Sequence, residues 1–202
     1  WENQVGRSKA FWKWCHPMLR EHFGTSVSSL SFDEVYGGVN IVRPDFIRVE
    51  ADEATYNMHI MVRFELERML LRGDLEVADI PEAWNARYKE YLGIDVPDNA
   101  RGCLQDVHWS MVSMGYFPTY TLGNLYCAQF FEKAMEDMPD LYGQFEQGAF
   151  GALKAWLNEN IHAHGKRYRA ADLCEQVTGK PLSAEPLMRH LEGKLKPLYG
   201  LA

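Results

Sequence analysis

The segment from residue 52 to about residue 72 constrains the fold more than any other part of the chain. Its apolar residues recur at intervals of three and four, which is the spacing of one face of an α-helix. These residues are Ala54, Met58, Met61, Val62, Leu66, Met69 and Leu70. Asp52 precedes the pattern and Gly73 follows it. The sequence therefore predicts one long amphipathic helix that begins near Asp52 and ends at Gly73.

Most of the remaining chain also reads as helices, separated by Gly, Pro and short polar turns. Helices are expected over residues 1–22, 31–40, 79–92, 118–138, 140–146, 152–163, 170–177 and from 183 towards the end. The best strand candidate is the short run of residues 46–49. We therefore expect an all-α fold with at most one short strand or hairpin near residues 41–50. The chain shows no internal repeat and no interdomain linker.

Composition and charge narrow the class of function. The formal net charge is -7, which argues against nucleic acid as the main partner because phosphate binding needs a basic face. No apolar run approaches the roughly 20 residues of a membrane span, and no signal peptide is visible. The four cysteines lie far apart without a C-x-x-C pair, which is typical of reduced thiols. We expect a cytoplasmic protein without a nucleic-acid or membrane partner.

The histidines do not form a recognisable metal motif. None of the seven is followed by Glu, so the chain contains no H-E-x-x-H sequence. No two histidines are spaced four apart on one expected helix, and His162 and His164 should lie on the surface. The sequence therefore offers no metal-ligand set.

Polar and aromatic side chains gather in residues 102–120, here called the central stretch. They include Gln105, Asp106, His108, Tyr116 and Tyr120. Irregular backbone with such side chains, placed between helices, often carries binding or catalytic groups. Asp106 is expected to accept a hydrogen bond from one ring nitrogen of His108 and to fix its tautomer, although His108 could also be structural. Tyr116 and Tyr120 are either core aromatics or phenols that donate to a developing oxyanion.

Arg48 lies in the strand candidate, and the acidic residues Glu50, Asp52 and Glu53 follow it closely. It could form a local ion pair with one of them. Alternatively, its planar guanidinium could clamp an anion such as a carboxylate. Asp52 is expected to cap the next helix or to orient Arg48. Together with the central stretch, Arg48 supplies half of a catalytic site: a cation, a histidine, an acid and phenols, without a nucleophile or a metal.

Two segments match longer motifs. Residues 47–52 read Ile-Arg-Val-Glu-Ala-Asp and fit the motif I-R-x-x-A-D. Residues 102–109 read Gly-Cys-Leu-Gln-Asp-Val-His-Trp and fit G-x-x-Q-D-x-H-W in every fixed position. These motifs, in this order, resemble those of the Taq-type zinc metallocarboxypeptidase family (the thermostable carboxypeptidase 1 family), and the resemblance covers essentially the whole chain. It implies a mainly helical, gluzincin-like fold with a deep cleft, and usually a homodimer.

The resemblance also bears on the metal. In that family an H-E-x-x-H helix supplies two zinc-binding histidines and the general-base Glu, and a later H-E-S segment supplies the third ligand. The family sequence Trp-Glu-Asn-x-Val-Gly-Arg follows directly, and residues 1–7 match it. Residues 1–202 are thus expected to be the C-terminal part of a single catalytic domain, with the zinc ligands on an N-terminal part. This chain alone should bind no zinc and should be inactive.

The activity implied by the resemblance is the removal of single amino acids from peptide C-termini with broad specificity, by a metal-activated water. Carried over by position, Arg48 would help hold the terminal carboxylate of the substrate. His108 would hydrogen-bond the substrate or the tetrahedral intermediate. Tyr116 would be the first candidate for stabilising the oxyanion, and Tyr120 the second.

Gln105 and Asp106 would orient His108 or contact the substrate. Two other functions remain open, namely a non-enzymatic helical interaction module and one half of a split protein that pairs with a separate N-terminal chain. If the chain is a cut piece, apolar residues of the first helix should be exposed, with Phe11, Trp12 and Trp14 as candidates.

Overall fold

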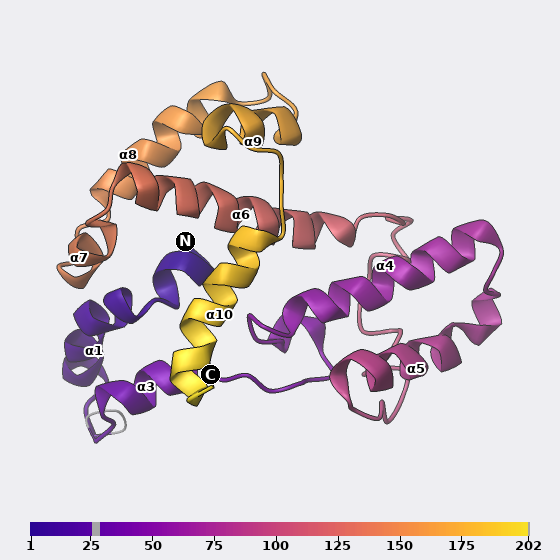
Figure 1. Cartoon of the computed structure of the whole chain (residues 1–202). Helices are drawn as coiled ribbons and strands as arrows, with labels where there is room; N and C mark the ends of the chain where they lie inside the picture. The colour runs from indigo at the N-terminus through magenta and orange to yellow at the C-terminus, as the bar shows by residue number, and fades with distance from the viewer. Residues whose placement is uncertain (26–28, 202) are drawn as a thin grey trace. The chain divides into compact units, whose positions relative to one another are not determined.

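The computed structural model describes residues 1–25 and 29–201, which form helices joined by turns and irregular segments (Figure 1). No β-strand occurs among these described residues, so the expected all-α class is confirmed. The chain divides into two compact units. Unit 1 comprises Trp1–Asn40 and Asn124–Ala202, and unit 2 comprises Ile41–Gly123.

Unit 1 contains most of the helices. They are α1 (Lys9–Phe23), α3 (Phe32–Val39), most of α6 (Pro118–Asp137), α7 (Leu141–Glu146), α8 (Gly151–Asn160), α9 (Ala170–Thr178) and α10 (Glu185–Tyr199). Short helical turns cover Glu2–Gly6 and His162–His164. The expected capping box is present, because the Ser31 hydroxyl accepts from the backbone of Glu34 and the Glu34 carboxylate accepts from the backbone of Ser31. Buried residues of α6, α7 and α8, including Ala134, Phe145 and Trp156, form the core.

The aromatic residues of α1 are packed within unit 1 rather than left open. The rings of Phe11 and Trp14 lie 5.5 Å apart, and both contact Phe150. The indole Nε1 of Trp12 donates to the carbonyl oxygen of Gly6 at 2.9 Å. All three α1 residues are partly buried, so the expected open apolar face on the first helix is not found.

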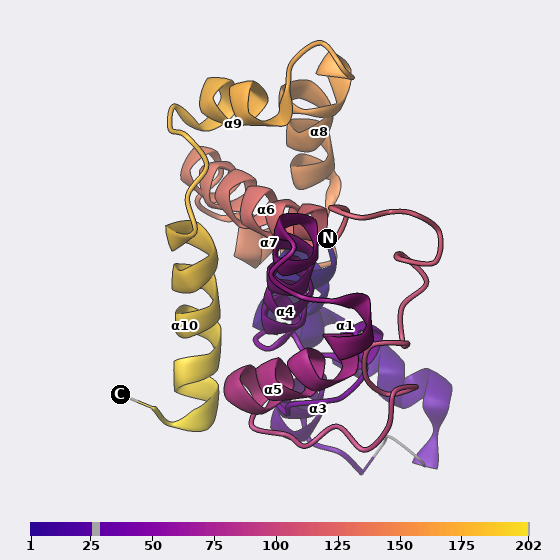
Figure 2. The ribbon, with the colours of Figure 1, turned by 90° about the vertical axis from the view of Figure 1, so that its right-hand side faces the viewer.

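Unit 2 carries the elements on which the candidate site is built. It consists of a 3₁₀ turn (Arg48–Glu50), α4 (Tyr56–Arg72), a second turn (Val77–Asp79), α5 (Ile80–Leu92), an irregular segment, and the first residues of α6. Helices α4 and α5 pack side by side (Figure 1). Figure 2 shows the irregular trace that leads from the end of α5 to the start of α6 and contains the central stretch.

The strand expected over residues 46–49 is absent. The chain instead forms a 3₁₀ turn, in which the Glu50 amide donates to Ile47 and the Ala51 amide donates to Arg48, each at 3.1 Å. The Arg48 amide donates to the side-chain oxygen of Gln105 at 2.8 Å. A side chain therefore takes the hydrogen bond that a neighbouring strand would have made.

Helix α4 ends before Gly73 as expected but begins at Tyr56, later than the predicted start near Asp52, and its buried face differs from the predicted apolar face. Met58 and Met61 belong to the predicted apolar face, yet they are 38% and 47% exposed. His59, Arg63 and Glu67 are buried instead, at 0%, 0% and 1% exposure. The spacing of four places these polar side chains along one stripe of the helix, beside the apolar core residues. The structural reason is that each of them has a partner outside the helix, as described below.

The apolar part of α4 can be tested by a matched pair of substitutions. Leu66 is fully buried in the core of unit 2, whereas Leu71 on the same helix is 73% exposed. Leu66→Ala should lower the free energy of unfolding by about 2–5 kcal/mol, because it removes buried methyl groups and leaves a cavity. Leu71→Ala should change it by no more than about 0.5 kcal/mol. Denaturant titration measures both, and equal losses would contradict the observed burial.

Candidate functional site

Arg48 lies at the centre of the candidate site. It is 7% exposed, and its Nε and Nη2 atoms donate to Asp106 Oδ1 at 3.1 Å and 2.7 Å. Its Nη1 donates to the hydroxyl of Tyr56 at 3.1 Å. Burial acts to lower the pKa of Arg48, but Asp106 and Tyr56 outweigh it and raise that pKa. The guanidinium is therefore charged and held by two partners, neither of which is one of the acids that follow it in sequence.

Asp106 joins two arginines. Its second oxygen, Oδ2, accepts from Arg63 Nε at 2.7 Å and lies 2.6 Å from Arg63 Nη2. Burial acts to raise the pKa of Asp106, but the two guanidinium groups outweigh it and lower that pKa. One negative charge thus faces two positive charges in a largely buried cluster. The cluster of Arg48, Asp106 and Arg63 has a net charge of about +1, which favours an anionic ligand.

Gln105 ties the two sequence motifs together. Its side-chain oxygen accepts from the backbone amide of Arg48, and its Nε2 donates to the carbonyl oxygen of Phe46 at 2.9 Å. The same Nε2 lies within hydrogen-bond distance of the carbonyl oxygens of Arg101 and Gly102. One side chain therefore fixes the backbone before Arg48 against the start of the central stretch.

The hydrogen bond expected between Asp106 and His108 is not formed. Asp106 Oδ1 and His108 Nδ1 are 3.9 Å apart, which is too long for a hydrogen bond. Both Asp106 oxygens are engaged by the two arginines, and His108 Nδ1 is buried without a hydrogen-bond partner among the described residues. The other ring nitrogen, Nε2, lies 3.0 Å from the hydroxyl of Tyr120. Tyr120 is thus the residue that orients His108.

The two tyrosines flank His108. Tyr116 is 50% exposed, and its ring centroid lies 5.8 Å from that of His108 and 5.4 Å from that of Tyr120. Burial raises the pKa of Tyr120, so its phenol is protonated at neutral pH. Its ring centroid lies 5.0 Å from Cζ of Arg48, which is within cation–π range. The structure therefore brings together all six residues singled out from the sequence, namely Arg48, Gln105, Asp106, His108, Tyr116 and Tyr120.

Sequence reasoning missed Arg63, Tyr88 and His59, which complete the network. The Tyr88 hydroxyl donates to the Phe46 carbonyl at 3.2 Å and lies 3.0 Å from His59 Nδ1. Arg63 Nη1 donates to the His59 carbonyl at 2.7 Å. The sequence contains a signal for two of them, because His59 and Arg63 are four residues apart in the segment predicted to be an amphipathic helix. Polar residues with this spacing share one face of a helix, and that face can be buried where the residues find partners.

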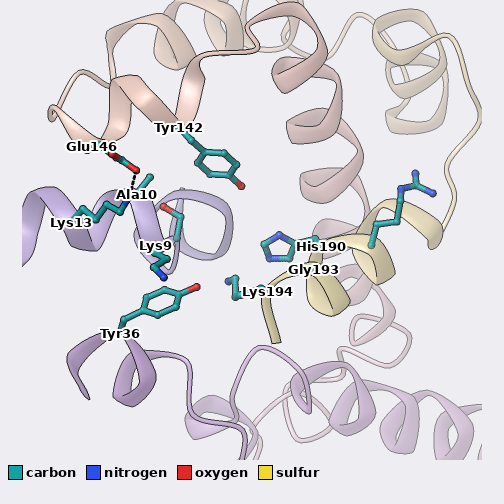
Figure 3. Close-up of a pocket in the computed structure, with 11 residues that line it drawn as sticks. Lys9, Ala10, Lys13, Tyr36, Tyr142, Glu146, His190, Gly193 and Lys194 are labelled. Carbon is teal, nitrogen blue, oxygen red and sulfur yellow. Dashed lines mark hydrogen bonds and ion pairs between the residues drawn. The ribbon is translucent and has the colours of Figure 1, made fainter. Parts of the chain in front are cut away.

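Unit 1 contains a cavity whose lining does not include these residues. It has a volume of about 410 Å³ and is lined by Lys9, Lys13, Tyr36, Tyr142, Lys194 and others (Figure 3). Lys13 pairs with Glu146 at 2.6 Å, and Arg189 pairs with Glu132 at 2.9 Å. Its lining contains none of the six sequence-predicted residues, so the candidate site is the Arg48 cluster of unit 2.

In the described part of the chain, no helix is both long and apolar enough to cross a membrane. Within residues 1–25 and 29–201, no group of three or more His, Cys, Asp or Glu side chains is arranged to hold a metal ion. The residues that the structure describes therefore do not fit a catalytic metal.

The two sequence motifs lie in unit 2 of this helical fold and are joined through the hydrogen bond between the Arg48 amide and Gln105. Residues 1–195 match the sequence model of the family described as carboxypeptidase Taq (M32) metallopeptidase. The chain belongs to that family, as the resemblance of the two motifs indicated.

Relatives and solved structures agree with this assignment. The chain is 49% identical over 200 residues to thermostable carboxypeptidase 1 of Thermus thermophilus, covering 99% of this chain and 39% of the relative. It is 40% identical to carboxypeptidase 1 of Bacillus subtilis, covering 98% and 40%. A crystal structure of an M32 carboxypeptidase from Deinococcus radiodurans superposes with a TM-score of 0.97 at 42% identity, covering 100% and 41%. The chain thus spans about 40% of the length of these relatives.

His59 makes a testable contribution to the pH dependence of stability. Burial, followed by the charge of Arg63, lowers the pKa of His59 from 6.5 to about 4. As the pH falls, His59 therefore takes up a proton in the unfolded chain before it does so in the folded chain. The stability of the folded chain that depends on neutral His59 is fully present above about pH 6.5. It is lost as the pH falls towards 4, by up to about 3 kcal/mol.

The free energy of unfolding, measured by denaturant titration between pH 7 and pH 4, checks this prediction. His59→Gln should flatten the slope in that range, because the titrating group is gone. His162→Gln, at an exposed position, should retain the slope and serves as the control. An unchanged slope in His59→Gln would contradict the assignment.

Proposed function

We propose that this chain is the substrate-binding part of a zinc-dependent carboxypeptidase, which removes single amino acids from peptide C-termini with broad specificity. The observation that carries the proposal is the net-positive cluster of Arg48, Asp106 and Arg63 beside His108 and two phenols. Membership of the carboxypeptidase Taq family and the printed names of the relatives support the activity.

The terminal carboxylate of a substrate suits Arg48. The guanidinium has five N–H groups, and three nitrogens each direct one of them to Asp106 or Tyr56. The remaining N–H groups can donate to a carboxylate, and the net charge of the cluster favours that anion over a neutral amide. Gln105 and Asp106 then serve as anchors of Arg48, rather than as partners of His108.

We assign the stabilisation of the oxyanion of the tetrahedral intermediate to His108, Tyr116 and Tyr120. Tyr116 is the first candidate, because its half-exposed phenol can reach a ligand and donate a hydrogen bond to a developing negative charge. Tyr120 is the second candidate, and its contact with His108 Nε2 also holds the imidazole in place. His108 would hydrogen-bond the substrate or the tetrahedral intermediate.

The metal implied by the family has no ligand set among the described residues, so the roles proposed for this chain are limited to binding and orienting the substrate. We propose that an N-terminal part of the same protein supplies the zinc ligands, and that this chain alone is inactive. We also propose that the intact protein is a cytoplasmic homodimer that acts on peptides. These proposals rest on the family resemblance.

Arg48 gives the sharpest test of the proposed function. In the intact protein, Arg48→Met should lower kcat/KM for a peptide with a free C-terminus by about 10- to 150-fold, which corresponds to one charged hydrogen bond. The preference for a free carboxylate over a C-terminal amide should shrink, because the cation that recognises the carboxylate is gone. Steady-state hydrolysis of the paired peptides, free and amidated, measures both effects.

Arg101→Met is the matched control, because Arg101 is exposed, forms its ion pair with Asp98 at 2.7 Å and lies over the ring of Phe46, without contacting Arg48. It should leave kcat/KM nearly unchanged. A folded Arg48→Met enzyme with the wild-type preference for free carboxylates would contradict the role of Arg48. Failure of the intact wild-type protein to hydrolyse any peptide would favour a non-enzymatic helical module.

Zinc content provides a second test. The purified 202-residue chain, dialysed against micromolar zinc and then freed of excess metal, should contain close to no zinc by elemental analysis. The physical reason is that its histidines and carboxylates are not gathered into a ligand set in the described residues. One zinc per chain would overturn this part of the proposal and would require a ligand set that the structure does not show.

A further inference from the structure

The central stretch needs an external support, because it has little regular structure of its own. From Arg101 to Phe117 the backbone forms turns, and Val112 and Gly115 have positive φ angles of 58° and 81°. Several of its large apolar side chains are exposed, among them Leu104, Val107, Met111 and Val112. Cys103 and Phe117 are buried near its two ends, but the apolar residues between them that are exposed add little to hold the part that carries His108 and Tyr116.

Glu67 of α4 supplies a direct connection to this segment. Its Oε1 accepts a hydrogen bond from the indole Nε1 of Trp109 and another from the backbone amide of Gly115, both at 3.0 Å. A single carboxylate oxygen thus binds the two ends of the turn formed by residues 109–115. Glu67 lies on a regular helix and is 1% exposed, so its position is well defined.

The two contacts lie next to two residues of the candidate site. Trp109 follows His108 in the chain, and Gly115 precedes Tyr116. The Trp109 ring also packs edge-on against Phe117, at a centroid distance of 6.2 Å. Both sides of the turn are therefore fixed immediately beside the groups assigned to the oxyanion.

Arg48 is held in a different way. Its hydrogen-bond partners are Asp106, Tyr56 and Gln105, and none of these bonds involves Glu67. Loss of Glu67 should thus disturb His108 and Tyr116 while leaving the carboxylate-binding cluster in place. Arg48 and the pair of His108 and Tyr116 are therefore held in place by different residues.

Burying this carboxylate is costly, which argues against a role in packing alone. Burial of a polar group without a hydrogen bond is unfavourable, and Glu67 Oε2 is buried without a hydrogen-bond partner among the described residues. An apolar side chain at this position would avoid the desolvation cost but would leave the Trp109 and Gly115 donors unpaired. The carboxylate therefore holds the turn at the expense of its own solvation.

We propose that Glu67 is a positioning residue, which holds Trp109 and Gly115 so that His108 and Tyr116 are placed against a substrate bound at Arg48. This role rests on the proposed carboxypeptidase function. Glu67 acts only through the turn and does not itself contact the substrate.

The kinetic test uses the intact protein. Glu67→Ala should lower kcat by about 10- to 100-fold, the usual effect of losing a residue that orients a catalytic group, and should leave KM nearly unchanged. Glu67→Gln should recover most of kcat, because the amide oxygen can accept the same two hydrogen bonds. Glu65→Ala is the matched control, since Glu65 also lies on α4 but binds Arg87 and Tyr91. It should leave kcat and KM close to wild type.

Amide hydrogen exchange gives a readout that does not depend on activity. The Gly115 amide should exchange faster in Glu67→Ala than in the wild type and should stay protected in Glu67→Gln. Amides of α5 should keep their protection in both variants, which reports that unit 2 remains folded. If Glu67→Ala fails to fold, Trp109→Phe removes one of the two donors while keeping an aromatic ring, and it should lower kcat by a smaller factor.

The outcomes separate the two proposals. Normal kcat in a folded Glu67→Ala enzyme, or an increase in KM alone, would overturn the positioning role while leaving the carboxypeptidase function intact. Unchanged exchange at Gly115 would overturn the contact itself. An inactive wild-type protein would overturn the proposed function and, with it, the role of Glu67 in positioning His108 and Tyr116. Faster exchange of the Gly115 amide in Glu67→Ala would still establish that Glu67 supports the turn.

Discussion

The candidate site depends on the position of Asp106 between Arg48 and Arg63. Its two oxygens connect the central stretch to the 3₁₀ turn and to helix α4, because Arg48 and Arg63 lie 58 and 43 residues before Asp106 in the sequence. Two buried guanidinium groups would repel each other without the carboxylate, and breaking a buried ion pair by removing one partner costs roughly 3–5 kcal/mol. The ion cluster therefore organises this part of unit 2 as well as giving it a positive charge.

Helix α4 acts as the rigid support of that arrangement. His59, Arg63 and Glu67 lie on one buried stripe, and each contacts a residue outside the helix, namely Tyr88, Asp106 and Trp109. Such a stripe is costly to bury unless its members find partners, but once paired it fixes several loops to one regular element. An irregular segment can thereby hold the residues of the candidate site in fixed positions without a strand or a helix of its own.

Local sequence rules predicted the helices well and the tertiary partners poorly. The apolar spacing and Gly73 gave α4 close to its observed bounds, and the two motifs identified Arg48 and Asp106 as site residues. Two predictions were wrong: the strand at residues 46–49, and the hydrogen bond in which His108 would donate to Asp106. In each case a contact from more than 40 residues away decided the structure, through Gln105 or through Arg63. Periodicity alone cannot report such contacts, since it measures only which residues share a face.

Tyr120 contacts both His108 and Arg48, the two main polar groups of the candidate site. Its hydroxyl contacts His108 Nε2, and its ring lies over the guanidinium of Arg48. Helix α6 fixes the Tyr120 backbone, because this residue lies in the first turn of a 20-residue helix. The phenol of Tyr120 can thus keep the imidazole of His108 at a fixed distance from the guanidinium of Arg48. It does so although Glu67 supports the turn beside His108 and Asp106 binds Arg48. The groups proposed to bind the carboxylate and the oxyanion are thus anchored by different residues. Tyr120 and Phe117 each contact both His108 and Arg48, so these two aromatic side chains set the spacing between the two groups.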